Sequence, residues 1–162
     1  MPSGMNESAK ILVDLMENWR FGPITIGQPV ATFSEVLCHS DGLVNLHPGT
    51  DLITFGPLHV ILYDGIVESI QLDFLGRPLT FQRDCLPKLM VSRSQLQFES
   101  FTRFLDSNDF LWWRDDTLSF DDQTTLGTES GVEIVFDNQQ LFHILASREF
   151  KAYAMRKKEA DK

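Results

Sequence analysis

The chain has 162 residues, a net charge of −9 and no apolar run near the ~20 residues of a membrane-spanning helix. These values predict one domain, residues 1–162, without a membrane partner. They also argue against a nucleic-acid partner, because phosphate contacts depend on Lys and Arg. The first residues lack the apolar segment of a secretory signal, and Cys38 and Cys85 are isolated cysteines, so we expect a cytoplasmic protein.

The charge is unevenly distributed along the chain. Residues 148–162 contain six basic and three acidic side chains, which leaves a net charge of −12 on everything before them. An acidic body of this kind predicts a basic protein as partner, although acidic surfaces also simply keep proteins in solution. The segment 148–162 itself is predicted to be a basic tail or a helix, with Lys and Arg near the C-terminus as the helix dipole favours.

The first half of the chain is predicted to contain two helices and several strands. Helical periodicity, ended by Gly22-Pro23, predicts an N-terminal helix, and residues 38–51 have the composition of a loop. The elements expected here are a helix at 6–19, a strand at 24–27, a short helix at 29–37, and strands within 52–74.

The clearest local signal is Asp64-Gly65, which lies between two apolar runs and predicts a hairpin. A two-residue turn would place His59 opposite Ile70, whereas a bulge would place Leu58 there. Apolar and polar residues alternate along the second strand of this hairpin. That alternation is typical of an antiparallel sheet that is covered on one face.

The second half repeats this pattern. Its expected elements are a strand from Leu89, a helix at 97–106, strands at 126–128, 132–136 and 141–146, and a helix at 148–160. Each half thus has a short strand, a short helix and three strands, and the helix residues Phe33 and Phe101 are 68 positions apart. Repetition on this scale predicts duplication of one unit, at residues 24–75 and again at 89–147. The predicted fold is α+β, with two tandem α-β-β-β units, a largely antiparallel sheet, an N-terminal helix and a C-terminal helix.

The segment 106–137 stands out because it holds nine acidic residues, several large apolar residues and a single base, Arg114. Trp112 and Trp113 are adjacent and would face opposite sides of a strand, so one is expected to be exposed unless both lie between the two units. An exposed Trp with an acidic rim is the composition of an interface hot spot. The residues predicted to bind a partner are Trp112, Trp113, Asp115, Asp116, Asp121 and Asp122.

Motifs of enzyme chemistry do not occur. The four histidines lack the spacing of a zinc site, and there is no phosphate-binding glycine loop and no nucleophile elbow. We therefore expect no catalytic, cofactor-binding or metal-binding residues. The alternative is a small-molecule-binding protein or an enzyme that uses a pocket between the two units.

The tandem helix-and-three-strand unit resembles the β-lactamase inhibitor protein family, whose repeats bind an enzyme across the concave face of a sheet. Gly27, Pro29 and Val36, followed later by the Tyr-Asp-Gly turn, are similar to the single unit of the small outer-membrane-assembly lipoproteins. This chain lacks their lipobox cysteine and has Cys38-His39 where a glycine usually follows the first helix.

In size, acidity and layout the chain is similar to small bacterial immunity proteins, which neutralise a co-encoded toxin. The resemblance covers residues 24–147. It implies a non-enzymatic immunity or inhibitor protein for a basic enzyme or toxin, and it leaves the oligomeric state open.

Overall fold

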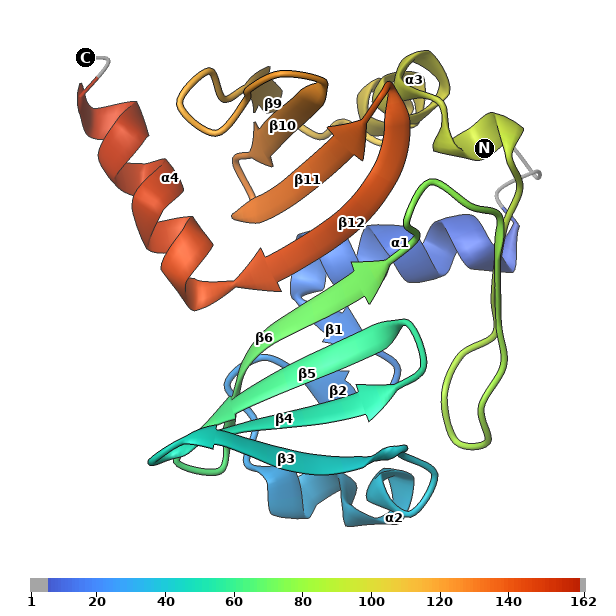
Figure 1. Cartoon of the computed structure of the whole chain (residues 1–162), viewed down its shortest axis with the longest axis vertical. Coiled ribbons are helices and arrows are strands. Elements are labelled where there is room, and N and C mark those ends of the chain that lie inside the picture. The colour runs from blue at the N-terminus through green and yellow to red at the C-terminus, as the bar shows by residue number, and fades with distance from the viewer. Residues whose placement is uncertain (1–5, 161–162) are drawn as a thin grey trace.

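The computed structural model describes residues 6–160 and has an α+β fold (Figure 1). Within this range there are one eight-stranded antiparallel sheet, two small two-stranded sheets and four α-helices. None of these helices is both long enough and apolar enough to cross a bilayer. The predicted fold class, with a helix near each end of the chain, is therefore confirmed.

The first half begins with α1, which is capped by the Asn6 side chain accepting from the Ala9 N–H at 2.8 Å. Trp19 ends this helix in the left-handed conformation, with φ of 56°. The elements of this half are α1 (Glu7–Asn18), β1 (Arg20–Phe21), β2 (Ile24–Thr25), the 3-10 helix η1 (Val30–Phe33), α2 (Ser34–Leu37), β3 (Gly42–His47), β4 (Thr50–Phe55), β5 (Leu58–Tyr63) and β6 (Ile66–Asp73).

The second half has a similar order of elements. They are β7 (Leu79–Phe81), β8 (Leu89–Val91), the 3-10 helix η2 (Ser94–Leu96), α3 (Phe98–Ser107), β9 (Trp112–Arg114), β10 (Gln123–Thr128), β11 (Val132–Asp137), β12 (Gln140–Ser147) and α4 (Arg148–Ala160). The basic segment is thus helical as far as Ala160, and residues 161–162 lie outside the described range.

The large sheet has the strand order β3-β4-β5-β6-β12-β11-β10-β9. Each half contributes a meander of four strands, rather than the three predicted, and the meanders join where β6 pairs antiparallel with β12. In that seam Ile70 lies opposite Ala146 and Leu72 lies opposite Ile144. The order of elements is compatible with the predicted duplication, which stays a prediction.

The helices lie on both faces of the sheet, but unequally. α1, α2 and α3 contribute apolar residues to one continuous core with β4–β6 and β10–β12, and α1 passes behind the strands in Figure 1. α4 contacts β11 and β12. Its buried residues Phe150 and Ala154, like Val135 of β11, lie outside that core cluster, which places them on the opposite face. We call the face toward α1 the core face and the other the outer face.

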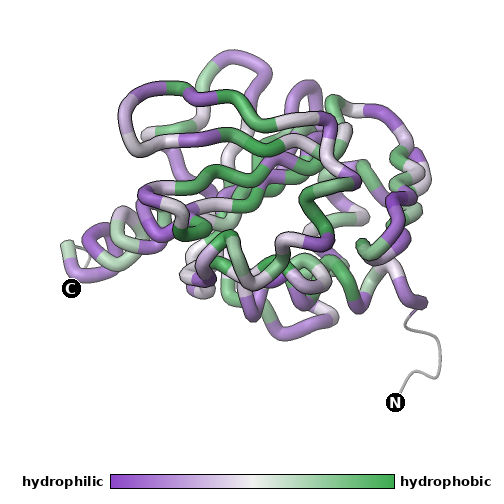
Figure 2. The backbone as a smooth tube through the Cα atoms, turned by 90° about the horizontal axis from the view of Figure 1, so that it is seen from below, coloured by the Kyte–Doolittle hydropathy of each residue, from purple (hydrophilic) through white to green (hydrophobic). Residues whose placement is uncertain are grey.

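Hydropathy follows this layering. Figure 2 shows the hydrophobic stretches gathered along the strands, whereas α4 is coloured mostly as hydrophilic. Along β11 the core-face residues Ile134 and Phe136 are fully buried, while Glu133 on the outer face is partly exposed. In β6, for which the alternation was predicted, buried and half-buried residues alternate over residues 66–68 and again over residues 70–73.

The β5–β6 hairpin forms at Asp64-Gly65, but its register differs from both predicted alternatives. Val60, and neither His59 nor Leu58, lies opposite Ile70. The register shifts between Ile61 and Leu62, where β6 carries one extra residue. This bulge reverses which face each β6 residue occupies on either side of it, so Val67 as well as Ile70 points into the core.

β3 and β7 lie where the sequence predicted no strand. Residues 38–51 were expected to form a loop, but they include β3, which pairs with β4. In the connection between the halves, β7 pairs with β8 to form a small sheet of its own. A strand needs a neighbour to hydrogen-bond with, and that neighbour is not visible in local composition.

Candidate protein-binding surface

The residues predicted to bind a partner lie on β9 and on the loop that joins it to β10 (Figure 1). We call residues 115–122 the acidic loop. β9 forms one edge of the large sheet through its pairing with β10, in which Trp113 lies opposite Gly127 and Trp112 opposite Thr128. The two indoles therefore leave opposite faces of the strand, as predicted, and both are half-buried.

Trp113 lies on the outer face and rests on Gly127. A Cβ atom at position 127 would come within 2.7 Å of the indole ring, so the glycine is what lets the ring lie flat against β10. Trp112 packs against the core, and its Nε1 donates to Asp106 Oδ1 at 2.8 Å. Neither indole is the freely exposed anchor that the sequence suggested, and neither bridges the two units.

Asp115 was predicted to meet a partner, and this prediction is wrong because the residue is fully buried. Its carboxylate accepts hydrogen bonds from the Tyr153 hydroxyl at 2.8 Å and from Lys157 Nζ at 3.3 Å. It also accepts from the backbone N–H groups of Thr117 and Leu118 at 3.0 and 3.1 Å. Asp115 therefore folds the acidic loop and fastens α4 to it.

The protonation of Asp115 reflects these contacts. Burial alone would raise the pKa of its carboxyl, but hydrogen bonds from Tyr153, the loop backbone and Lys157 outweigh burial and hold the pKa below its usual value. Burial and the same carboxylate raise the pKa of the Tyr153 hydroxyl. Asp115 is thus a carboxylate at neutral pH, and Tyr153 remains a donor to it.

The other acids of the loop are exposed. The Asp116 side chain is 89% exposed and lies 3.3 Å from Arg114. Asp121 and Asp122 are both on the surface, and none of the ion pairs within residues 6–160 involves either of them. Asp137 lies nearby on β11, opposite Gln123, which directly follows Asp122.

Two exposed apolar residues accompany these acids. Phe120 of the acidic loop is 61% exposed and Leu111, just before β9, is 68% exposed. The aromatic residue that the surface offers is therefore Phe120 rather than a tryptophan. Sequence reasoning missed it because phenylalanine has no polar group and is usually assigned to the core. Its position directly before Asp121-Asp122 was the signal available.

A recess of about 470 Å³ lies between β9 and α4, on the outer face. Trp112 and Trp113 line it from the strand, and Lys157 and Lys158 line it from the helix. Both lysines already have acidic partners, since Lys158 Nζ lies 2.5 Å from Glu129 and Lys157 binds Asp115. The recess belongs to the second half and α4, and not to a junction between the two units.

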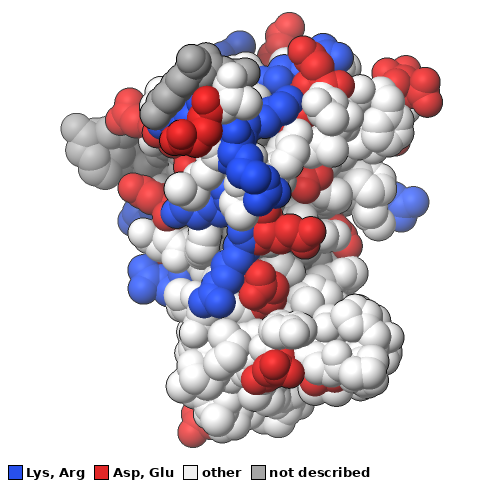
Figure 3. Space-filling view, turned by 90° about the vertical axis from the view of Figure 1, so that its left-hand side faces the viewer, with Lys and Arg blue, Asp and Glu red and all other residues white. Residues whose placement is uncertain are grey.

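Figure 3 shows how the charges are arranged on the side of the molecule that is at the left in Figure 1. Lys and Arg side chains form a band through the middle of this side, with Asp and Glu beside them. Within α4, Arg148, Lys157 and Lys158 each form an ion pair with one of the protein's own acids. The lower third of the view carries few charged side chains.

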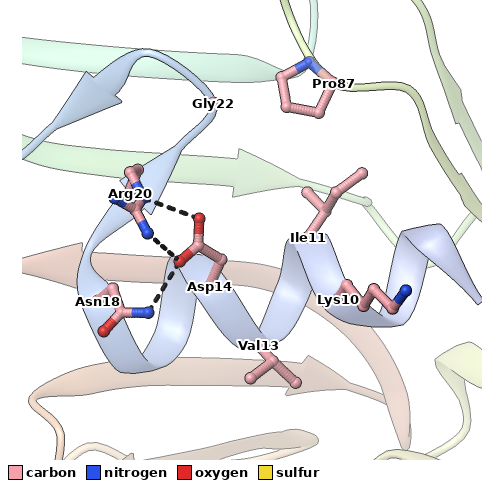
Figure 4. Close-up of a pocket in the computed structure, with 8 residues that line it drawn as sticks. All are labelled: Lys10, Ile11, Val13, Asp14, Asn18, Arg20, Gly22 and Pro87. Atoms are coloured by element: carbon pink, nitrogen blue, oxygen red, sulfur yellow. Dashed lines mark hydrogen bonds and ion pairs between the residues drawn. The ribbon is translucent and has the colours of Figure 1, made fainter. Parts of the chain in front are cut away.

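A shallower recess of about 390 Å³ lies along α1 (Figure 4). Its carboxylate, Asp14, accepts two hydrogen bonds from Arg20 at 2.9 and 3.0 Å and one from Asn18 at 2.8 Å. The hydrogen bond from Arg20 is the main reason that the pKa of Asp14 lies below its usual value. With these partners Asp14 ties α1 to β1 and has little capacity left for a ligand.

The histidines do not build a metal site. Among residues 6–160 no group of three or more His, Cys, Asp or Glu side chains is placed to hold a metal ion. His59 lies 3.5 Å from Asp73, and His143 lies 3.9 Å from Glu133, all on the outer face of the sheet. These pairs are spread along the strands and line none of the recesses described above.

Comparison with protein families, with curated proteins and with solved structures finds no match to this chain.

Proposed function

We propose that this chain is a non-enzymatic protein-binding module that neutralises a basic enzyme or toxin, as immunity and inhibitor proteins do. The observation that carries the proposal is the exposed phenyl ring of Phe120, directly followed by the exposed carboxylates of Asp121 and Asp122. An apolar anchor rimmed by charge is the usual anatomy of an interface hot spot. Hydrogen bonds to Asp115 fold the acidic loop, so a partner would meet a surface that is already formed.

The charge balance supports a basic partner. The chain has a net charge of −9, and part of its positive charge is consumed internally, because Lys157 and Lys158 bind Asp115 and Glu129. Exposed carboxylates then attract a cationic protein over roughly a Debye length, ~8 Å at physiological salt, before contact is made. Asp121 and Asp122 are the carboxylates best placed to do this next to Phe120.

We also propose that the protein is cytoplasmic. Cys38 and Cys85 are both free and exposed. Exposed thiols persist as thiols in a reducing compartment, whereas secreted proteins usually pair them. A cytoplasmic location would suit a protein that protects its own cell from a toxin.

The test begins with capture of partners by the tagged full-length chain from its source cell, followed by kinetics with the purified partner. Neutralising Asp116, Asp121 and Asp122 together, each to Asn, should slow association about tenfold or more at low salt and flatten its salt dependence. Phe120→Ala should mainly speed dissociation, since burial of the ring is felt only after docking.

A matched control changes three exposed acids elsewhere on the surface, Glu17, Glu35 and Glu99, each to Gln. This control loses the same charge but should leave most of the association rate intact. Capture of an acidic partner, or an equal loss of rate in both triple variants, would contradict the proposed surface. A captured enzyme whose activity the chain does not inhibit would contradict the inhibitor function.

A further inference from the structure

The edge of the sheet opposite the acidic loop is β3, and all six of its residues are exposed. Three of them are large and apolar: Leu43 and Val44 are each 57% exposed and Leu46 is 48% exposed. An edge strand presents a row of unpaired backbone N–H and C=O groups, so it is a template for another strand. Here that template also carries apolar side chains.

β3 lacks most of the devices that prevent edge pairing. It contains no Lys, no Glu and no Pro, and its one bulge lies near the end of the strand, between Asn45 and His47, which leaves residues 43–45 regular. Asp41, just before the strand, is already paired: it accepts from the Gly56 N–H at 2.6 Å and from Arg83 at 2.9 Å. The other edge, β9, is only three residues long.

The side chains of β3 continue two apolar rows of the sheet. On the core face Leu43 lies opposite Ile53, which is buried. On the outer face Val44 lies opposite Leu52, and Leu52 lies opposite Ile61. The outer row is only half-buried, and the strands with which α4 makes its main contacts are β11 and β12. A strand added at β3 would therefore prolong both rows.

We propose that the strand added at β3 is β3 of a second copy of this chain, paired antiparallel about a two-fold axis at Val44. A two-fold axis perpendicular to the sheet keeps each face on its own side, so paired residues must come from the same face. Pairing centred on Val44 meets this condition: Val44 lies opposite its own copy, and Leu43 lies opposite Asn45. One sheet then runs through both copies.

The distribution of charge favours a second copy of the chain as the occupant of the β3 edge. Each copy has a net charge of −9, so two copies repel except where they meet through uncharged surface. β3 has no charged residue, and the lower third of Figure 3, which corresponds in height to β3–β5 in Figure 1, carries few charges. A basic partner, in contrast, would be drawn to the acidic loop. β3 and β9 are at opposite ends of the strand order, so the dimer leaves both acidic loops free.

The test is sedimentation velocity of the full chain at rising protein concentration, in low and in high salt. The wild type should dimerise, and more tightly in high salt, because screening weakens the repulsion between the two acidic copies. Binding of a basic protein at the acidic loop should show the opposite salt dependence, so the two surfaces can be told apart.

Two variants locate the interface. Val44→Lys places like charges opposite each other and should weaken dimerisation about tenfold or more. Met90→Lys is the matched control: Met90 is 65% exposed on β8, outside the large sheet, and this variant should dimerise like the wild type. Circular dichroism of both variants should be unchanged, since both side chains are on the surface.

A disulfide cross-linking experiment tests the pairing register of the two β3 strands without relying on a loss of binding. In a Cys38→Ser, Cys85→Ser background, Val44→Cys should form an intermolecular disulfide on mild oxidation, and Leu43→Cys should form far less, because it faces Asn45 of the other copy. A wild type that stays monomeric at all concentrations would overturn the proposal. So would a dimer that Val44→Lys leaves intact, or a monomer that instead takes up an extended segment of another protein at β3.

Discussion

The two halves of the large sheet have the same meander of four strands, yet they differ in what covers their outer faces. In the second half α4 lies against β11 and β12, and Val135 of β11 is buried to 3% exposure. In the first half Leu52 and Ile61 on the same face are only half-buried, and Val44 at the edge is exposed. One added helix thus turns a sheet face into an interior. Where no helix is added, the same kind of face stays partly exposed.

The core face is covered by helices in both halves, so equivalent substitutions there should destabilise the protein to a similar extent. These substitutions should also have the largest effect on the free energy of unfolding. Phe33 and Phe101, one from each half, are both 3% exposed. Replacing either with Ala should lower the free energy of unfolding by about 3–5 kcal/mol, through lost burial and the cavity left behind. Urea denaturation followed by circular dichroism measures this loss. A loss below ~1 kcal/mol at Phe101 would mean that its ring does not fill the core.

The same two variants test whether the halves unfold together. All three tryptophans report on the second half, because Trp19 Nε1 donates to the Ser130 carbonyl at 3.0 Å and the other two lie on β9. We expect Phe33→Ala to shift the tryptophan-fluorescence transition as far as the circular-dichroism transition, since β6 and β12 pair along the seam. If Phe33→Ala leaves the midpoint of the fluorescence transition unchanged, the two halves unfold separately.

The attachment of α4 is the next point at which the halves differ. Asp115→Asn removes the charge that binds Lys157 and Tyr153 and should cost about 2–3 kcal/mol of unfolding free energy. The matched variant Asp116→Asn changes an exposed neighbour and should stay within about 0.5 kcal/mol of the wild type. Equal effects of the two variants in denaturation experiments would contradict the anchoring role of Asp115.

The contacts of Asp115 also predict that the stability of the protein depends on pH. The folded-state pKa of Asp115 lies below its unfolded value, so the stability it confers is present above the unfolded pKa of about 3.9 and is lost as the pH falls through the folded pKa. Asp14 and Asp41 also have lowered pKa values and contribute in the same direction. The wild type should therefore lose stability below about pH 4, and Asp115→Asn should lose less over the same acid range.

The smallest expected effect concerns the indole on β9. Gly127→Ala would bring a methyl group within 2.7 Å of the Trp113 ring and should cost about 1–2 kcal/mol of unfolding free energy. Because the clash needs both side chains, adding Trp113→Ala to Gly127→Ala should cost less than the sum of the two single changes. Strict additivity in this double-mutant cycle would show that the ring does not rest on Gly127.

Much of the fold was predictable because its signals are local. The apolar periodicity of α1, the amphipathic face of α3 and the Asp64-Gly65 turn each depend on neighbouring residues. β3 was missed for the opposite reason: its polar surroundings look like a loop, and only pairing with β4 makes it a strand. The bulge in β6 was missed because composition does not fix the register of a hairpin.

The candidate site was harder to predict. Asp115 looks no different in sequence from Asp116, and its burial depends on Tyr153 and Lys157, which come 38 and 42 residues later. The only hint was that these two residues are four positions apart and so share one face of a helix. Trp113 is half-buried because Gly127 lets its ring lie against β10, a contact between residues 14 positions apart that local composition does not reveal.

The seam between β6 and β12 has a consequence for the order in which the protein is made. The innermost pair of the sheet joins the strand that closes the first meander to the last strand of the chain. At a synthesis rate of roughly 5–20 residues per second, β6 emerges several seconds before β12 exists to pair with it. During that interval the first meander has two open edges, the apolar strand β6 at one end and β3 at the other. The growing polypeptide is therefore most prone to associate with its neighbours just before its final strand is complete.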